Sequence, residues 1–89
     1  MSVNLEVAMY KNKNQDGSLN LCGKKIKVLR QAMIPIVSQR MLADQLQLIG
    51  IDLDKNAIQK IESGKRFVTD IEIVAFAKLF NITVDELLK

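Results

Sequence analysis

Residue types that carry chemistry are missing or rare in this chain of 89 residues. It contains no histidine and no tryptophan, one cysteine and one proline, and only 4% of its residues are aromatic. The single cysteine, Cys22, can form no disulfide within the chain, and no histidine is present to activate it, so we expect an inert apolar side chain. Clustered cysteine and histidine ligands for a metal ion are absent as well.

The sequence also lacks the other common signatures of catalysis. We find no paired-carboxylate pattern and no glycine-rich phosphate loop. The GKK at residues 23–25 has neither the upstream glycine nor the following Ser or Thr of such a loop. The sequence therefore predicts a protein that is not an enzyme and uses no cofactor.

Long apolar stretches are absent too. The longest apolar runs are only a few residues, whereas roughly 20 are needed to span a bilayer. The chain shows no basic-then-apolar signal segment. Together with the single cysteine, these absences predict a cytoplasmic protein with no membrane partner.

What the chain does contain is mostly aliphatic, since hydrophobic residues make up 48% of it, enough for one compact core. From Gly23 onward the apolar residues recur at helical spacing and predict five short helices. The first helix ends before Pro35. The other four begin after the N-cap residues Ser38, Asp54, Thr69 and Thr83. Gly50 and Asn81 mark helix ends, and Gly64 is expected in the left-handed conformation that ends a helix.

The first 22 residues have a different pattern. Apolar residues alternate over residues 3–9 and again over residues 19–21, on either side of a polar stretch that ends in Asp16-Gly17. This pattern predicts either a β-hairpin with an Asp-Gly turn or a disordered arm. We therefore divide the chain into an N-terminal arm or hairpin, residues 1–22, and a helical domain, residues 23–89.

The net charge of +3 is unevenly distributed. Residues 1–22 are neutral, residues 23–66 carry nine Lys or Arg against four Asp or Glu, and residues 67–89 have a net charge of −2. A polyanion would therefore bind the middle of the chain. A face of solvated lysines is the alternative interpretation.

The helix expected over residues 55–63 has one apolar and one polar face. Ala57, Ile58 and Ile61 are predicted to point inward, and the outward positions are Lys55, Asn56, Gln59 and Lys60. Asn and Gln can pair with two edge atoms of adenine, and Lys can donate to guanine or to a phosphate. The pattern fits a recognition helix, although an ordinary amphipathic helix would have the same two faces.

From Gly23 to Leu88 the chain resembles the phage-repressor-like (Cro/cI, or XRE) helix-turn-helix family. The matching pieces, in the family's order, are GKKIKVLR, SQRMLADQL, AIQKIESGKR and IVAFAKLFNITVDELL. The resemblance covers about three quarters of the chain. It implies an all-α, five-helix, lambda-repressor-like domain that binds double-stranded DNA.

The resemblance also implies roles for individual residues. Base contacts are expected from Gln39, Lys55, Asn56, Gln59 and Lys60. Phosphate contacts are expected from Ser38, Arg40, Lys65 and Arg66. Arg30 and Glu62 match a largely buried ion pair, which we assign to the architecture.

Two segments depart from the common family pattern. Fourteen residues separate Ala43 from Ile58, so the turn between the second and third helices is long, and it resembles that of a long-turn subgroup. The connection around residues 34–37 is also longer than usual and apolar. It is expected to contribute either to the core or to a surface for a partner.

The sequence as a whole predicts a sequence-specific transcriptional regulator, expected to be a repressor, that binds a palindromic operator as a homodimer. The dimer surface is expected at the N-terminal arm, the last helix or the apolar 34–37 connection, with the arm slightly favoured. The competing hypothesis is a protein-interaction module of the same fold, such as an antitoxin or an adaptor.

Overall fold

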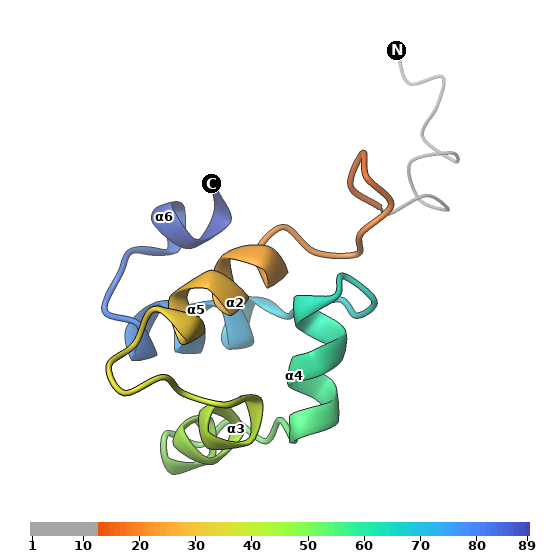
Figure 1. Cartoon of the computed structure of the whole chain (residues 1–89). Coiled ribbons are helices and arrows are strands. Elements are labelled where there is room, and N and C mark those ends of the chain that lie inside the picture. The colour runs from red at the N-terminus through yellow and green to blue at the C-terminus, as the bar shows by residue number, and fades with distance from the viewer. Residues whose placement is uncertain (1–12) are drawn as a thin grey trace, which may run out of the picture.

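The computed structural model describes residues 13–89, and this part of the chain is all-helical, with no β-strand. Figure 1 shows its five helices, which are α2 (Gly23–Gln31), α3 (Gln39–Leu48), α4 (Lys55–Glu62), α5 (Asp70–Leu79) and α6 (Val84–Leu88). The prediction of an all-α domain with five helices is confirmed.

Four of the helices begin at the N-cap residues that the sequence predicts. The side chains of Ser38, Asp54, Thr69 and Thr83 each accept a hydrogen bond from the backbone amide three residues further on, at 2.8 to 3.2 Å. Each such bond satisfies an amide that has no partner within its own helix. Thr69 and Thr83 complete capping boxes with Glu72 and Glu86.

The residues that end the helices are also those that the sequence indicates. Gly50, Gly64 and Asn81 all have positive φ angles, of 87°, 77° and 57°, and each lies just beyond a helix. The left-handed conformation predicted for Gly64 is therefore confirmed. Helix α2 ends at Gln31, four residues before Pro35, and α4 ends at Glu62, one residue earlier than expected.

The segment before α2 forms a turn but not the second strand of a hairpin. The backbone amide of Gly17 donates to the Asn14 carbonyl at 2.9 Å, which closes the predicted Asp-Gly turn. The strand predicted over residues 19–21 is absent because the Leu19 amide donates to the Gly64 carbonyl, beyond α4. The first predicted strand, over residues 3–9, lies outside the described residues.

The core lies between α2, α3, α4 and α5 and is closed by α6. Its fully buried side chains are aliphatic except for one aromatic and one thiol, and they are Ile26, Leu42, Leu46, Ile58, Ile61, Leu87, Phe76 and Cys22. Burial raises the pKa of the Cys22 thiol, so the thiol stays protonated and unreactive.

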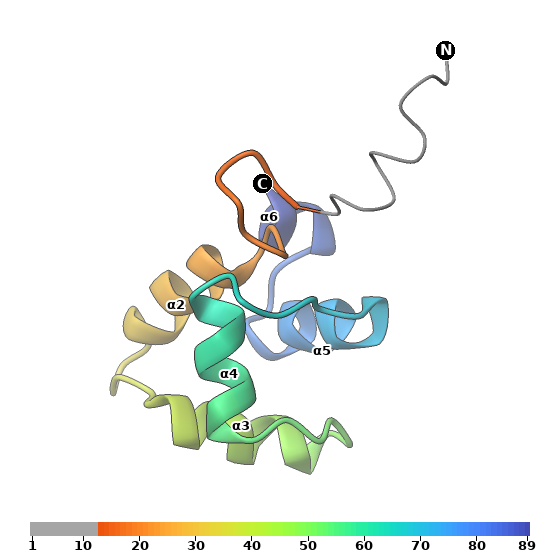
Figure 2. The ribbon, with the colours of Figure 1, turned by 90° about the vertical axis from the view of Figure 1, so that its right-hand side faces the viewer.

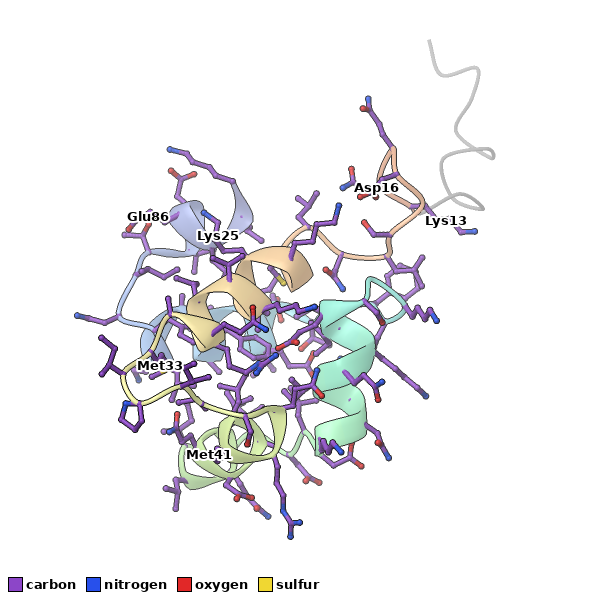
Figure 3. The ribbon with its side chains drawn as sticks, in the orientation of Figure 1. Lys13, Asp16, Lys25, Met33, Met41 and Glu86 are labelled. Atoms are coloured by element: carbon purple, nitrogen blue, oxygen red, sulfur yellow. The ribbon has the colours of Figure 1, made fainter. Side chains whose placement is uncertain are left out.

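The apolar connection between α2 and α3 divides between core and surface. Val37 is buried, whereas Ile34 is 98% exposed and Ile36 is 66% exposed. Figure 3 shows Met33 at the start of this connection, and Met33 is half-buried against the core. Val37 therefore belongs to the core, and the two isoleucines are exposed.

Candidate nucleic-acid interface

Helix α4 lies at the outside of the molecule; in Figure 2 it stands in front, between α2 on the left and α5 on the right, with α3 near its N-terminal end. Ile58 and Ile61 are fully buried and hold the helix against the core. The four predicted outward side chains are all exposed, and they are Lys55, Asn56, Gln59 and Lys60. The division of α4 into an apolar and a polar face is thus as predicted.

The exposed polar residues of α4 form a short strip. Asn56, Gln59 and Lys60 stand three and four residues apart, so their side chains are neighbours on one helix face. From Lys55 to Lys60 the helix rises by about 7.5 Å, at about 1.5 Å per residue. This strip offers amide and ammonium groups that can donate to, or accept from, a ligand lying along the helix.

The N-terminal end of α3 lies beside this strip. The Ser38 hydroxyl accepts a hydrogen bond from Met41 N at 3.1 Å, so its own hydrogen remains able to donate outward. Arg40 is exposed and lines a shared groove with Lys55. Gln39 is half-buried, and its Nε2 donates to Glu62 Oε1 at 3.0 Å, a contact the sequence analysis did not predict.

The expected ion pair between Arg30 and Glu62 is present and buried. Arg30 donates from Nε and Nη2 to the two carboxylate oxygens, at 2.8 and 2.9 Å, and from Nη1 to the Val37 carbonyl at 3.0 Å. The hydrogen bond to Glu62 raises the pKa of Arg30, so its positive charge is secure. The pair joins α2 to the end of α4 and to the connection before α3.

The loop after α4 places its two basic residues differently. Lys65 is exposed and lines one groove with Asn56 and Lys60. Arg66 is half-buried and donates from Nη1 and Nη2 to Glu72, at 2.9 and 3.2 Å. Both loop residues are predicted to contact phosphate, but only Lys65 has its side chain exposed to solvent, whereas Arg66 forms an intramolecular ion pair.

Three carboxylates lie close to the N-terminal end of α4. Asp44, Asp52 and Asp54 line the same groove as Arg40 and Lys55. Their negative charge offsets the two cations locally. The strongest surplus of positive charge along α4 is therefore at its C-terminal end, near Lys60 and Lys65. The summed charge of residues 23–66 did not show this difference between the two ends of the helix.

Asn20 is a structurally important residue that the sequence analysis missed. Its Oδ1 accepts from Gly23 N at 2.8 Å, and its Nδ2 donates to the carbonyls of Ile61 and Arg66, at 3.0 and 2.8 Å. An asparagine three residues before a helical amide is a capping signal, and it could have indicated the first of these bonds. The two bonds to the end of α4 cross the fold and have no local signal.

Within residues 13–89 no group of acidic or cysteine side chains is arranged to hold a metal ion. Nor is any helix in this range both long enough and apolar enough to cross a membrane. Comparison of the chain with family models, curated proteins and solved structures found no match.

Proposed function

We propose that this protein is a sequence-specific regulator of transcription that binds double-stranded DNA with α4 in the major groove. The observation that carries the proposal is the exposed polar strip on α4, a helix whose opposite face fully buries Ile58 and Ile61, half-buries Ala57, and packs against α3. A helix held in this way presents its side chains in a defined orientation, as reading of base edges requires.

The side chains on α4 match the chemistry of base edges. Asn56 and Gln59 can each form two hydrogen bonds with adenine, and Lys55 and Lys60 can donate to the acceptors of guanine. Arg40 shares a groove with Lys55 at one end of the strip and Lys65 shares one with Lys60 at the other, so both could reach phosphates, and Ser38 at the start of α3 is a further proposed phosphate contact. Arg66 would reach a phosphate only after leaving Glu72, so we place it last among the proposed contacts.

We further propose that the protein acts as a homodimer on a palindromic operator and represses transcription there. The strip on one α4 spans about 7.5 Å, which corresponds to only two or so base-pair steps of roughly 3.4 Å. A helix that contacts so few base pairs distinguishes few DNA sequences. If two copies bind half-sites about one helical turn apart, the ratio of specific to non-specific affinity is multiplied by the contribution of the second copy.

A salt titration of DNA binding tests the proposal. If Arg40 and Lys65 each neutralise one phosphate, a plot of log K against log salt should have a slope of about −1.8 for each protomer, and a slope of about −3.6 would mean that Lys55 and Lys60 contact phosphates as well. Fluorescence anisotropy with mixed genomic fragments measures the slope. Selection of bound DNA from a random library then identifies the preferred site. Absence of binding at low salt would overturn the proposal.

The exposed apolar residues favour a second candidate function, a protein-interaction module of the antitoxin or adaptor type. Ile34 and Ile36 protrude together from one connection, and exposed apolar clusters mark protein contacts. Binding through this surface should depend little on salt. Replacing both isoleucines by serine would abolish such an interaction and leave the binding of one protomer to a DNA half-site by α4 intact, so the pair of measurements separates the two functions.

A further inference from the structure

A short stretch of chain before α2 is bound tightly to the end of α4. Asn20 uses both ends of its side-chain amide there. Its oxygen binds the first amide of α2 (Gly23), and its nitrogen binds the carbonyls of Ile61 and Arg66. One side chain therefore links three segments: the start of α2, the last turn of α4 and the loop that follows it.

The backbone on either side of this asparagine adds to the contact. The Leu19 amide donates to the Gly64 carbonyl at 2.8 Å, and the Ser18 hydroxyl donates to the Asn20 carbonyl at 3.0 Å. A Cβ atom on Gly64 would lie 2.7 Å from the Ser18 Cβ, so only glycine permits this approach. Figures 1 and 2 both show the chain before α2 passing beside the loop after α4.

Lys65 lies at the centre of the loop that this stretch holds. The carbonyls on either side of it, those of Gly64 and Arg66, accept the bonds from Leu19 and Asn20. The Lys65 amide itself donates to the Lys60 carbonyl at 2.8 Å. Three hydrogen bonds, one from the Lys65 amide and two to the neighbouring carbonyls, thus hold the backbone around Lys65, while its side chain remains exposed.

We propose that residues 18–20 form a clamp that sets the position of Lys65 for contact with phosphate, and that Asn20 is its positioning residue. The inference rests on the proposed DNA-binding function. A preset loop loses less conformational freedom when DNA binds, so affinity is higher when the clamp is closed. Any event that detaches the clamp, such as a partner or a protease acting on the N-terminal segment, lowers affinity for all sequences.

The test replaces Asn20 by aspartate, which keeps the size of the side chain and the acceptor for Gly23. The substitution puts an oxygen opposite the carbonyls of Ile61 and Arg66 in place of the donor nitrogen. Hydrogen exchange at the Lys65 and Leu19 amides should accelerate at least about tenfold. DNA affinity should fall several-fold on every sequence, with site preference unchanged and the salt slope reduced by about one.

Asn14→Asp is the matched control, since it adds the same charge in the same segment at an exposed position. It should leave the exchange rates unchanged. A double-mutant cycle identifies the route: on a Lys65→Ala background, Asn20→Asp should cause no further loss of affinity beyond that of the control. If the Asn20→Asp variant does not fold, Asn20→Ser replaces it in the exchange and affinity measurements. Serine adds no charge and keeps an acceptor for Gly23.

The outcomes separate the clamp from the proposed function. Unchanged exchange at Lys65 in both Asn20 variants would overturn the clamp, whether or not the protein binds DNA. If the wild type binds no DNA, the proposed function is wrong, and the clamp cannot set Lys65 for a phosphate. Faster exchange in the Asn20 variants would then show only that the clamp holds the loop. Faster exchange with affinity equal to that of Asn14→Asp would show that the clamp does not act on DNA binding.

Discussion

Glu62 accepts hydrogen bonds from two side chains of opposite expected roles, the structural Arg30 and the proposed base reader Gln39. Because a carboxylate only accepts, the amide nitrogen of Gln39 must face it, and the amide oxygen is left for a ligand. In this position Gln39 can accept from the N6 amino group of adenine or the N4 amino group of cytosine with its oxygen, while its second N–H remains able to donate. The buried carboxylate of Glu62 thus fixes the orientation of the Gln39 amide.

At the same scale, Arg66 and Glu72 form a second pair that is less buried than the first. Glu72 also completes the capping box of α5 by accepting from Thr69 N at 3.0 Å. Burial alone would raise the pKa of Glu72, but the hydrogen bonds from Arg66 and Thr69 outweigh it and lower the pKa below its ordinary value of 4.5. One carboxylate therefore connects the loop after α4 to the start of α5.

Removing the amide side chains of α4 should affect specificity and not general affinity. Asn56→Ala and Gln59→Ala should each cost roughly 1 to 3 kcal/mol on the selected site and relax its sequence preference. Lys65→Ala is the matched comparison, and it should weaken binding to all sequences about equally. Competition binding with single-base variants of the site measures both effects. Unaltered preference in Asn56→Ala would contradict our assignment of α4 as the recognition helix.

The lowered pKa of Glu72 predicts an acid-sensitive contribution to stability. Since its folded pKa lies below the unfolded one, the contribution is fully present above about pH 4.5 and is lost as the pH falls through the folded pKa. Wild type should therefore be more stable than Glu72→Gln at pH 7, and the difference should shrink in acid. Urea unfolding between pH 7 and pH 3 measures it, with Asp70→Asn, an exposed acid in the same turn, as the control. A difference independent of pH would contradict the assignment.

At the scale of elements, α4 is a short helix of 8 residues that depends on its surroundings. The long turn before it is anchored at several points. The Ile51 amide donates to the Leu46 carbonyl at 3.0 Å, and Leu53 is buried in the core. Asp54 then caps the first turn of α4. The extra length of the turn therefore does not leave the N-terminal end of α4 unsupported.

The cap at Asp54 affects both stability and the charge of the proposed interface. Asp54→Ala should lower the free energy of unfolding by about 1 kcal/mol, because the Ala57 amide loses its partner. Asp54→Asn should preserve the cap, since asparagine is an equally good N-cap residue. It should also raise DNA affinity by removing a negative charge beside Lys55. Thermal unfolding and anisotropy measure the two effects. Equal stability of the alanine and asparagine variants would contradict the role of the cap.

At the scale of the whole molecule, hydrogen bonds join the segment before α2 to the loop after α4. Lys24, at the start of α2, also pairs with Asp16 in the turn that Figure 3 shows beyond the helices, at 3.3 Å. Hydrogen bonds from Ser18 and Lys24 lower the pKa of Asp16 to about 2, so this carboxylate is ionised at neutral pH. The described segment before α2 is therefore held to the helices by hydrogen bonds and an ion pair.

Because the segment before α2 is bound to the loop after α4, the test of the proposed dimer must leave that segment in place. If the N-terminal arm forms the dimer surface, removal of residues 1–12 should give a monomer by light scattering and reduce operator affinity. The truncation stops at residue 12 because a cut at residue 20 would also remove the clamp. An unchanged dimer would reject the arm, and the double variant Ile34→Ser, Ile36→Ser would then test the exposed connection between α2 and α3.

The sequence by itself determined the helices and the polar face of α4. Each N-cap bond joins residues only three positions apart, and the apolar spacing within a helix is equally local, so both can be read along the chain. The exposure of Lys55, Asn56, Gln59 and Lys60 followed from the same periodicity.

Only the tertiary structure decided which of the proposed site residues are free to act. Gln39 is bound to Glu62 across 23 residues of sequence, and Asn20 to Ile61 across 41. Such contacts depend on how helices pack, and no spacing rule within one segment predicts them. For the same reason the sequence could not distinguish Lys65, which faces solvent, from Arg66, which the start of α5 holds.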